Sequence, residues 1–196
     1  MTGQYGPVAQ ALWLALPVTL AGLTHVLVID RRGLAQLSAI RLDGGLELRG
    51  RPLFGANKTL RGAIVMMSAC VVWTVIVDLL QRGLGLDDSL RFIPREQLGS
   101  LALGLLLGLA YIVGELPNSF IKRQLDIGPG AAAKGRARPV FWLLDQLDSA
   151  VAILAIVSVF RAPSFVFVLT LLSLTLAVHP AVAALMVALG LKERIG

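Results

Sequence analysis

Five long apolar segments constrain the fold more than any other feature of this sequence. They span residues 7–29, 62–80, 98–116, 139–160 and 165–189. A helix rises 1.5 Å per residue, so about 20 residues cross the roughly 30 Å hydrocarbon core of a bilayer. The segments do not alternate apolar with polar residues, which argues against a transmembrane barrel. The pattern predicts a single domain over residues 1–196, an all-α integral membrane protein with about five transmembrane helices.

The positive charge of the chain is concentrated in its predicted loops. Lys and Arg give a net charge of +6 and gather in the first and third loops and in the tail, whereas the loop 81–97 balances its arginines with acidic residues. Because basic loops stay on the cytoplasmic side, we expect the N-terminus outside and the C-terminus in the cytoplasm. This asymmetry explains the charge without a nucleic-acid partner and predicts a multi-pass protein of the cytoplasmic membrane. The first segment lacks a basic leader and a small-residue cleavage site, so we interpret it as a helix rather than a removable signal.

Two carboxylates lie inside the fourth apolar segment. Asp145 and Asp148 are three residues apart and share a helix face, and each costs at least ~2.5–3.5 kcal/mol inside a membrane. A hard cation such as Mg²⁺, bound by carboxylate oxygens and substrate phosphates, is the most economical compensation. Two alternatives stay open from these residues: a structural salt link to Arg138 or Lys134, and a proton relay in a small ion-coupled transporter.

A glycine-flanked basic motif precedes the second apolar segment. Residues 55–62 read Gly-Ala-Asn-Lys-Thr-Leu-Arg-Gly, so Asn57, Lys58, Thr59 and Arg61 lie where a helix N-terminus adds unpaired amides. These groups suit a phosphate. The alternative is an ordinary cytoplasmic loop with turn glycines.

A second basic motif ends the third segment. Glu115 closes the apolar run, and Pro117 is expected to kink or end the helix. If the helix resumes, Ser119, Lys122 and Arg123 share one face that could bind a polyphosphate. Alternatively, Glu115 reaches the membrane interface and the two basic residues are an ordinary flank of the segment.

The remaining polar residues of the apolar segments are expected to have packing roles. His25, Asp30 and Asp78 are interpreted as interfacial or packing residues, and His179 before Pro180 as a hydrogen-bonded histidine at a kink.

Two glycines and the single cysteine bear on how the helices pack. Gly104 and Gly108 allow tight helix packing, within one chain or in a possible homodimer. As a single cysteine, Cys70 excludes an internal disulfide, and it is expected to be a small core or lipid-facing residue.

Read together, these motifs resemble a known family. Ser119-Phe-Ile-Lys-Arg followed by Asp145-Gln-Leu-Asp-Ser is similar to the signature of membrane CTP-dependent cytidylyltransferases, in which Ser-x-x-Lys-Arg precedes Asp-Arg-x-Asp-Ser. Gln146 in place of Arg, together with the upstream Phe-Gly-Ala-Asn-Lys-Thr-Leu-Arg-Gly motif, resembles the CDP-archaeol synthase family. The resemblance covers about residues 42–192.

The resemblance implies the reaction CTP + lipid phosphate → CDP-lipid + pyrophosphate, with a lipid of the archaeol or diacylglycerol type. It assigns Mg²⁺ to three carboxylates, Asp145, Asp148 and Glu115. It assigns phosphate neutralisation to four basic residues, Lys122, Arg123, Lys58 and Arg61, of which the first two act in catalysis with the aspartates. It assigns substrate hydrogen bonds to Asn57, Thr59, Asn118 and Ser119. CTP would then meet the lipid phosphate at the cytoplasmic surface.

Overall fold

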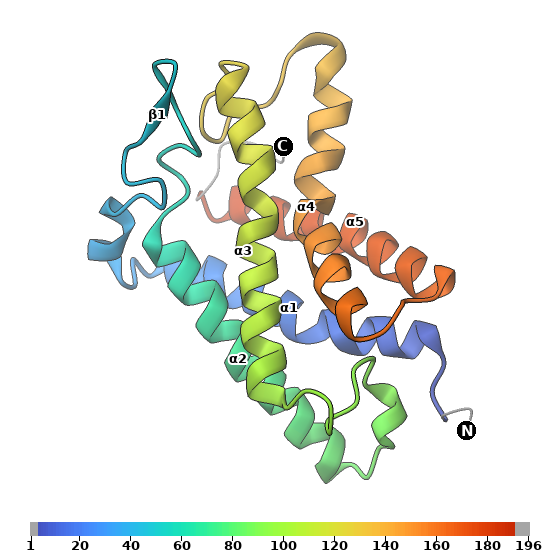
Figure 1. Cartoon of the computed structure of the whole chain (residues 1–196). Helices are drawn as coiled ribbons and strands as arrows, with labels where there is room; N and C mark the ends of the chain where they lie inside the picture. The colour runs from blue at the N-terminus through green and yellow to red at the C-terminus, as the bar shows by residue number, and fades with distance from the viewer. Residues whose placement is uncertain (1–3, 191–196) are drawn as a thin grey trace.

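The computed structural model describes residues 4–190 and shows five long helices (Figure 1). They are α1 (Pro7–Asp30), α2 (Leu60–Gly83), α3 (Ser100–Gln124), α4 (Arg138–Phe160) and α5 (Phe165–Ala188). All five are long and apolar enough to cross a membrane, which confirms the predicted class. Lys192 and Arg194, which belong to the tail that we counted as cytoplasmic, lie outside the described residues.

The helix boundaries match the predicted segments except at the end of α3. The expected segment stops at residue 116, but α3 continues through Pro117 to Gln124. Proline removes one backbone hydrogen bond, and a membrane helix tolerates that loss when its neighbours support it. Of the two outcomes expected at Pro117, a kink or an end of the helix, the end does not occur, so Ser119, Lys122 and Arg123 lie on a continuous helix.

The helices form a closed ring. Each contacts its neighbour in the sequence, and α5 returns to pack beside α1, with the two running in the same direction in Figure 1. Gly104 and Gly108 let α3 approach α2, because a Cβ on them would lie 2.6 Å from Cα of Val71 and 2.7 Å from Cα of Met67. The small-residue spacing thus serves packing within the chain.

One end of the ring is filled by side chains. The loop between α2 and α3, which contains the short helix η2 (Asp88–Leu90), places Phe92 against Phe167 of α5 with ring centroids 4.1 Å apart. The guanidinium of Arg161 lies 5.4 Å from the centre of the Phe92 ring. Gln10 of α1 donates to the carbonyl of Ser89 at 2.7 Å, which fixes the loop to the start of α1. We call this the packed end.

The two basic loops meet at the other end, which we call the basic end. They contain η1 (Ala35–Ala39), the hairpin of β1 (Glu47–Leu48) and β2 (Arg51–Pro52), and η3 (Gly135–Ala137). Arg51 of the hairpin pairs with Asp126 at 2.5 Å and donates to the carbonyl of Gln124. The first loop is therefore docked on the end of α3.

Candidate active site

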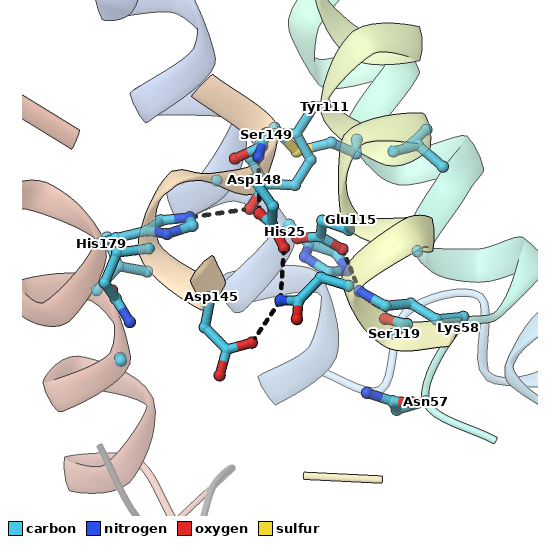
Figure 2. Close-up of a pocket in the computed structure, with 18 of the residues that line it drawn as sticks. His25, Asn57, Lys58, Tyr111, Glu115, Ser119, Asp145, Asp148, Ser149 and His179 are labelled. Atoms are coloured by element: carbon cyan, nitrogen blue, oxygen red, sulfur yellow. Dashed lines mark hydrogen bonds and ion pairs between the residues drawn. The ribbon is translucent and has the colours of Figure 1, made fainter. Parts of the chain in front are cut away.

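A close contact between α3 and α4 builds the centre of the site. A Cβ on Gly114 would lie 2.7 Å from Cβ of Ala152 and 2.8 Å from the carbonyl oxygen of Asp148. The absence of a side chain at this position lets the next turns of α3 face the acidic turn of α4 (Figure 2). A larger residue would push the two helices apart.

Asp145 and Asp148 are joined by one amide. The buried Asn118 donates from Nδ2 to Asp145 Oδ1 at 2.7 Å and to Asp148 Oδ2 at 3.1 Å. The buried Lys122 places its Nζ 2.6 Å and 2.5 Å from the two oxygens of Asp145. The cation beside Asp145 thus comes from α3 and not from the basic residues at the start of α4.

Glu115 is the third carboxylate of the site and pairs with Lys58. Two hydrogen bonds position the lysine: its main-chain carbonyl accepts from the amide of Leu42 at 2.8 Å, and the hydroxyl oxygen of Thr59 caps α2 by accepting from the amide of Gly62 at 3.3 Å. The side chains of Lys58 and Glu115 are 17% and 26% exposed, so the pair is largely buried but still accessible to solvent or a ligand.

Arg123 is the clearest sign of an anionic ligand. It is 6% exposed, yet its Nε and Nη1 atoms have no hydrogen-bond partner among residues 4–190. Gly55 packs on it with φ +97°, where a Cβ would lie 3.1 Å from Nη1. Buried donors of this kind cost about 1–3 kcal/mol each unless an acceptor reaches them. A phosphate oxygen fits that requirement.

The loop that carries Gly55 is organised by Asp43. This buried carboxylate accepts from Arg41 at 2.9 Å and from the amides of Gly45, Phe54 and Gly55 at 3.0, 3.0 and 3.2 Å. Burial by itself raises the pKa of Asp43, but the bonds from Arg41 and the three amides outweigh it and hold the pKa well below its ordinary value. Asp43 is therefore an anion that fixes the loop against Arg123.

One cavity of about 750 Å³ connects these groups. Its polar lining contains all the predicted site residues: Asn57, Lys58, Thr59, Arg61, Glu115, Asn118, Ser119, Lys122, Arg123, Asp145 and Asp148. Its apolar walls come from α1, between Leu14 and Ile29, and from α5, between Leu171 and Met186. Fifteen residue steps of helix make each wall about 22 Å long. The cavity therefore has a polar region and a long apolar region.

Two histidines line this cavity as well. His25 of α1, which we expected to be an interfacial or packing residue, lies on the cavity wall, with Nε2 3.6 Å from the place that a Cβ would take on Gly62. His179 of α5 lies 3.2 Å from the hydroxyl of Tyr111, which agrees with the expected hydrogen-bonded histidine (Figure 2). No motif surrounds His25 in the sequence, and the weak signal was the polar pair Thr24-His25 inside an apolar helix.

The residues around Asn118 fit a hard divalent cation. Within the described part of the chain, no three acidic, histidine or cysteine side chains come close enough to form a metal cluster. However, the buried Asn118 Oδ1 has no donor among the described residues, and a half-turn of the amide would place it beside Asp145 and Asp148. Two carboxylates and an amide oxygen are ligands that Mg²⁺ accepts, with the remaining positions filled by water and substrate phosphates.

Comparisons with known proteins point to one family. The family model CarS-like, CDP-archaeol synthase, matches residues 7–195. A CDP-archaeol synthase of Methanopyrus kandleri is 31% identical over 179 residues, covering 91% of this chain and 87% of that protein. One from Thermofilum pendens is 30% identical over 192 residues, covering 97% and 82%. A solved structure, described as an intramembrane enzyme for archaeal membrane lipids biosynthesis, shares the fold with a TM-score of 0.63 at 24% identity, over 87% of this chain and 90% of that one.

Proposed function

Because the chain belongs to the CarS-like family of CDP-archaeol synthases, we propose that it transfers a cytidylyl group from CTP to the phosphate of an isoprenoid glycerol ether lipid. The coarser activity, CTP-dependent cytidylyl transfer to a lipid phosphate in membrane lipid synthesis, is that of the family. The isoprenoid lipid, in preference to a diacylglycerol lipid, is the finer part of the proposal. Relatives that match most of the chain are CDP-archaeol synthases, which supports it.

The observation that carries the proposal is the single cavity with two kinds of wall. Cations and carboxylates of α2, α3 and α4 line its polar region, and the apolar region runs between α1 and α5. A nucleoside triphosphate needs the first kind of wall, and the chains of a membrane lipid need the second. Both substrates of a cytidylyl transfer can therefore meet in one place.

The reaction makes one phosphorus–oxygen bond and breaks another. An oxygen of the lipid phosphate bonds to the α-phosphorus of CTP, and the bond from that phosphorus to the bridging oxygen of the β-phosphate breaks. The electron pair leaves with pyrophosphate. Catalysis of such a transfer is mainly positioning and charge neutralisation.

The residues divide this work by their chemistry. Lys122 and Arg123 supply positive charge to the phosphates of CTP, and the unpartnered Arg123 nitrogens donate to their oxygens. Asp145 and Asp148 would hold Mg²⁺, with Glu115 completing the acidic face. A bound Mg²⁺ would neutralise the phosphate charge that develops during transfer. When the substrate and Mg²⁺ bind, the ammonium group of Lys122 would have to move from the Asp145 carboxylate to a phosphate oxygen.

Polar side chains at the mouth of the cavity orient the substrates. Ser119, Asn57 and Thr59 line it and can donate or accept hydrogen bonds. Arg61 adds a further positive charge at the start of α2. We place the basic end of the bundle in the cytoplasm, where CTP is available, which follows the positive-inside rule.

An ion-coupled transporter is not supported. It would need an open polar path between the two ends, but the buried side chains of Phe92, Phe167, Leu107 and Val157 close the packed end, and the charged residues there bond to one another. The carboxylates of the cavity therefore face one end of the bundle.

The test is turnover of a lipid panel. Purified protein in detergent receives CTP, Mg²⁺ and either an isoprenoid diether glycerol phosphate or a diacylglycerol phosphate, and released pyrophosphate and CDP-lipid are measured. We expect kcat/KM for the isoprenoid lipid to be at least about tenfold higher, since fit of the branched chains contributes roughly 1–3 kcal/mol. A preference for the diacylglycerol lipid would reject the finer proposal, and no product from either lipid would reject the activity.

A further inference from the structure

The cations of the cavity fall into two groups. Lys122 and Arg123 lie at the end of α3, and Arg123 packs under the loop at the surface of the basic end. Lys58 and Arg61 lie instead where α2 begins, within electrostatic range of His25 near the end of α1. Lys58 pairs with Glu115, which precedes Lys122 by seven residues, or about 10 Å along α3. The division therefore suggests two anion subsites.

The second group adjoins the apolar walls. His25 belongs to α1 and His179 to α5, the two helices that form the long apolar groove. On both helices the lining residues that precede the histidine, from Leu14 on α1 and from Leu171 on α5, are mainly apolar. The apolar lining continues past the histidines to Ile29 and Met186, so His25 and His179 are the titratable side chains with which these two walls could bind the phosphate of a lipid whose chains lie in the groove.

The side chains at this level can bind a phosphate monoester. Lys58 has three ammonium donors, and the pair with Glu115 engages one of them. Glu115 interacts electrostatically with His25 and His179 as well as with Lys58, and all four side chains line the same cavity. The hydroxyl of Tyr111 fixes the ring of His179 at 3.2 Å and acts as a positioning group.

We infer that His25, Lys58 and His179 form the subsite for the acceptor phosphate of the lipid, separate from the subsite for the CTP phosphates at Lys122 and Arg123. This inference rests on the proposed function and adds which wall binds which substrate. The geometry of transfer requires such a separation, because the attacking and leaving oxygens lie roughly in line on opposite sides of the α-phosphorus.

The experiment measures the KM of each substrate with the other saturating. His25→Gln and His179→Gln should each raise the KM for the lipid phosphate about tenfold, since each replaces an imidazole that can carry a positive charge by a neutral amide. The KM for CTP should stay within about twofold. Arg123→Gln should show the opposite pattern, and Tyr111→Phe should raise the lipid KM by about threefold. Thr170→Val, on the exposed face of α5 with its hydroxyl bonded within the helix, is the matched control.

A second measurement does not depend on turnover. Binding of the radiolabelled lipid phosphate to detergent-solubilised protein without CTP should weaken about tenfold in His25→Gln. The lipid alcohol without phosphate should bind both forms equally. Retained CTP binding reports that a variant is folded. An unchanged lipid affinity, or an equal loss for phosphate and alcohol, would overturn the subsite, whereas a wild type that binds lipid phosphate but makes no product would overturn only the proposed activity.

Discussion

Two groups of buried charges occupy opposite ends of the same helices, and they are built differently. Near the packed end, Asp78 accepts from Arg82 at 2.8 Å, from Arg91 at 2.8 Å and from Arg95 at 2.7 Å. The guanidinium of Arg91 also donates to the hydroxyl of Ser100 and to the main-chain carbonyls of Ile93 and Leu98 in the loop. One carboxylate is thus shared by three arginines, and the void beside it measures only about 30 Å³.

The cavity is built differently. Three carboxylates and four basic residues line it, but among the described residues ion pairs join only Lys122 to Asp145 and Lys58 to Glu115. Asp148 accepts from the uncharged amide groups of Asn118 and Ser149. The comparison teaches how to separate a structural charge cluster from a functional one. In the first, the charged groups bond to one another and to the chain and leave no room, whereas the second has unpartnered Arg123 donors and space for ligands.

The largest effect should come from removing a carboxylate of the cavity. Asp148→Ala should lower kcat/KM by about 10²–10³-fold, the typical loss when a preorganised charge at a reaction centre is removed. Its thermal stability should change little, since burial of this carboxylate is unfavourable in the free protein. Pyrophosphate release and thermal unfolding in detergent would measure the two. Full activity of the variant would remove Asp148 from the site.

Removing the carboxylate at the packed end should lower stability rather than activity. Asp78→Ala leaves three arginines around a lost carboxylate and should destabilise the fold by about 3–5 kcal/mol. The activity of the molecules that remain folded should be close to normal, because the cluster lies away from the cavity lining. A variant that kept its stability but lost activity would erase the distinction between the two ends.

A substitution that disturbs the contact of α3 with α4 at Gly114 should have an intermediate effect. Gly114→Val should cost about 1–3 kcal/mol through overpacking and should lower activity, because it separates Asn118 from Asp145 and Asp148. Gly83→Ala is the control, since a Cβ there meets no atom within 4 Å. Equal melting temperatures and rates for the two variants would mean that the close approach is not needed.

The smallest effect should come from Asp43, a carboxylate beside the site that accepts hydrogen bonds from Arg41 and from three main-chain amides. The pKa of Asp43 is depressed in the folded state, so its contribution is complete above the unfolded pKa of about 3.9 and is lost as the pH falls toward the folded value. Asp43→Asn should therefore cost about 1 kcal/mol at pH 7, and the difference from the wild type should shrink below about pH 4. Unfolding curves at pH 7 and at pH 3.5 would show it. A difference that stayed constant with pH would contradict the charged role of Asp43.

Much of the site could be predicted from the sequence, because membrane burial makes polar residues conspicuous. Asp145, Asp148 and Glu115 were noticed since carboxylates are costly in apolar segments. Lys58 and Arg123 were noticed in short motifs beside helix ends. His25 was not, because a single neutral histidine in an apolar helix carries a small cost and no motif.

The sequence by itself determined the five helices and the chemical content of the site, since hydrophobic length and the cost of buried charge act locally along the chain. Only the tertiary structure decided which charges meet. Glycines at positions 104, 108 and 114 set the helix distances, the ring brings α5 back to α1, and the docked loop places Gly55 on Arg123. These are contacts between residues far apart in the chain, and close packing, which depends on shape in three dimensions, selects them.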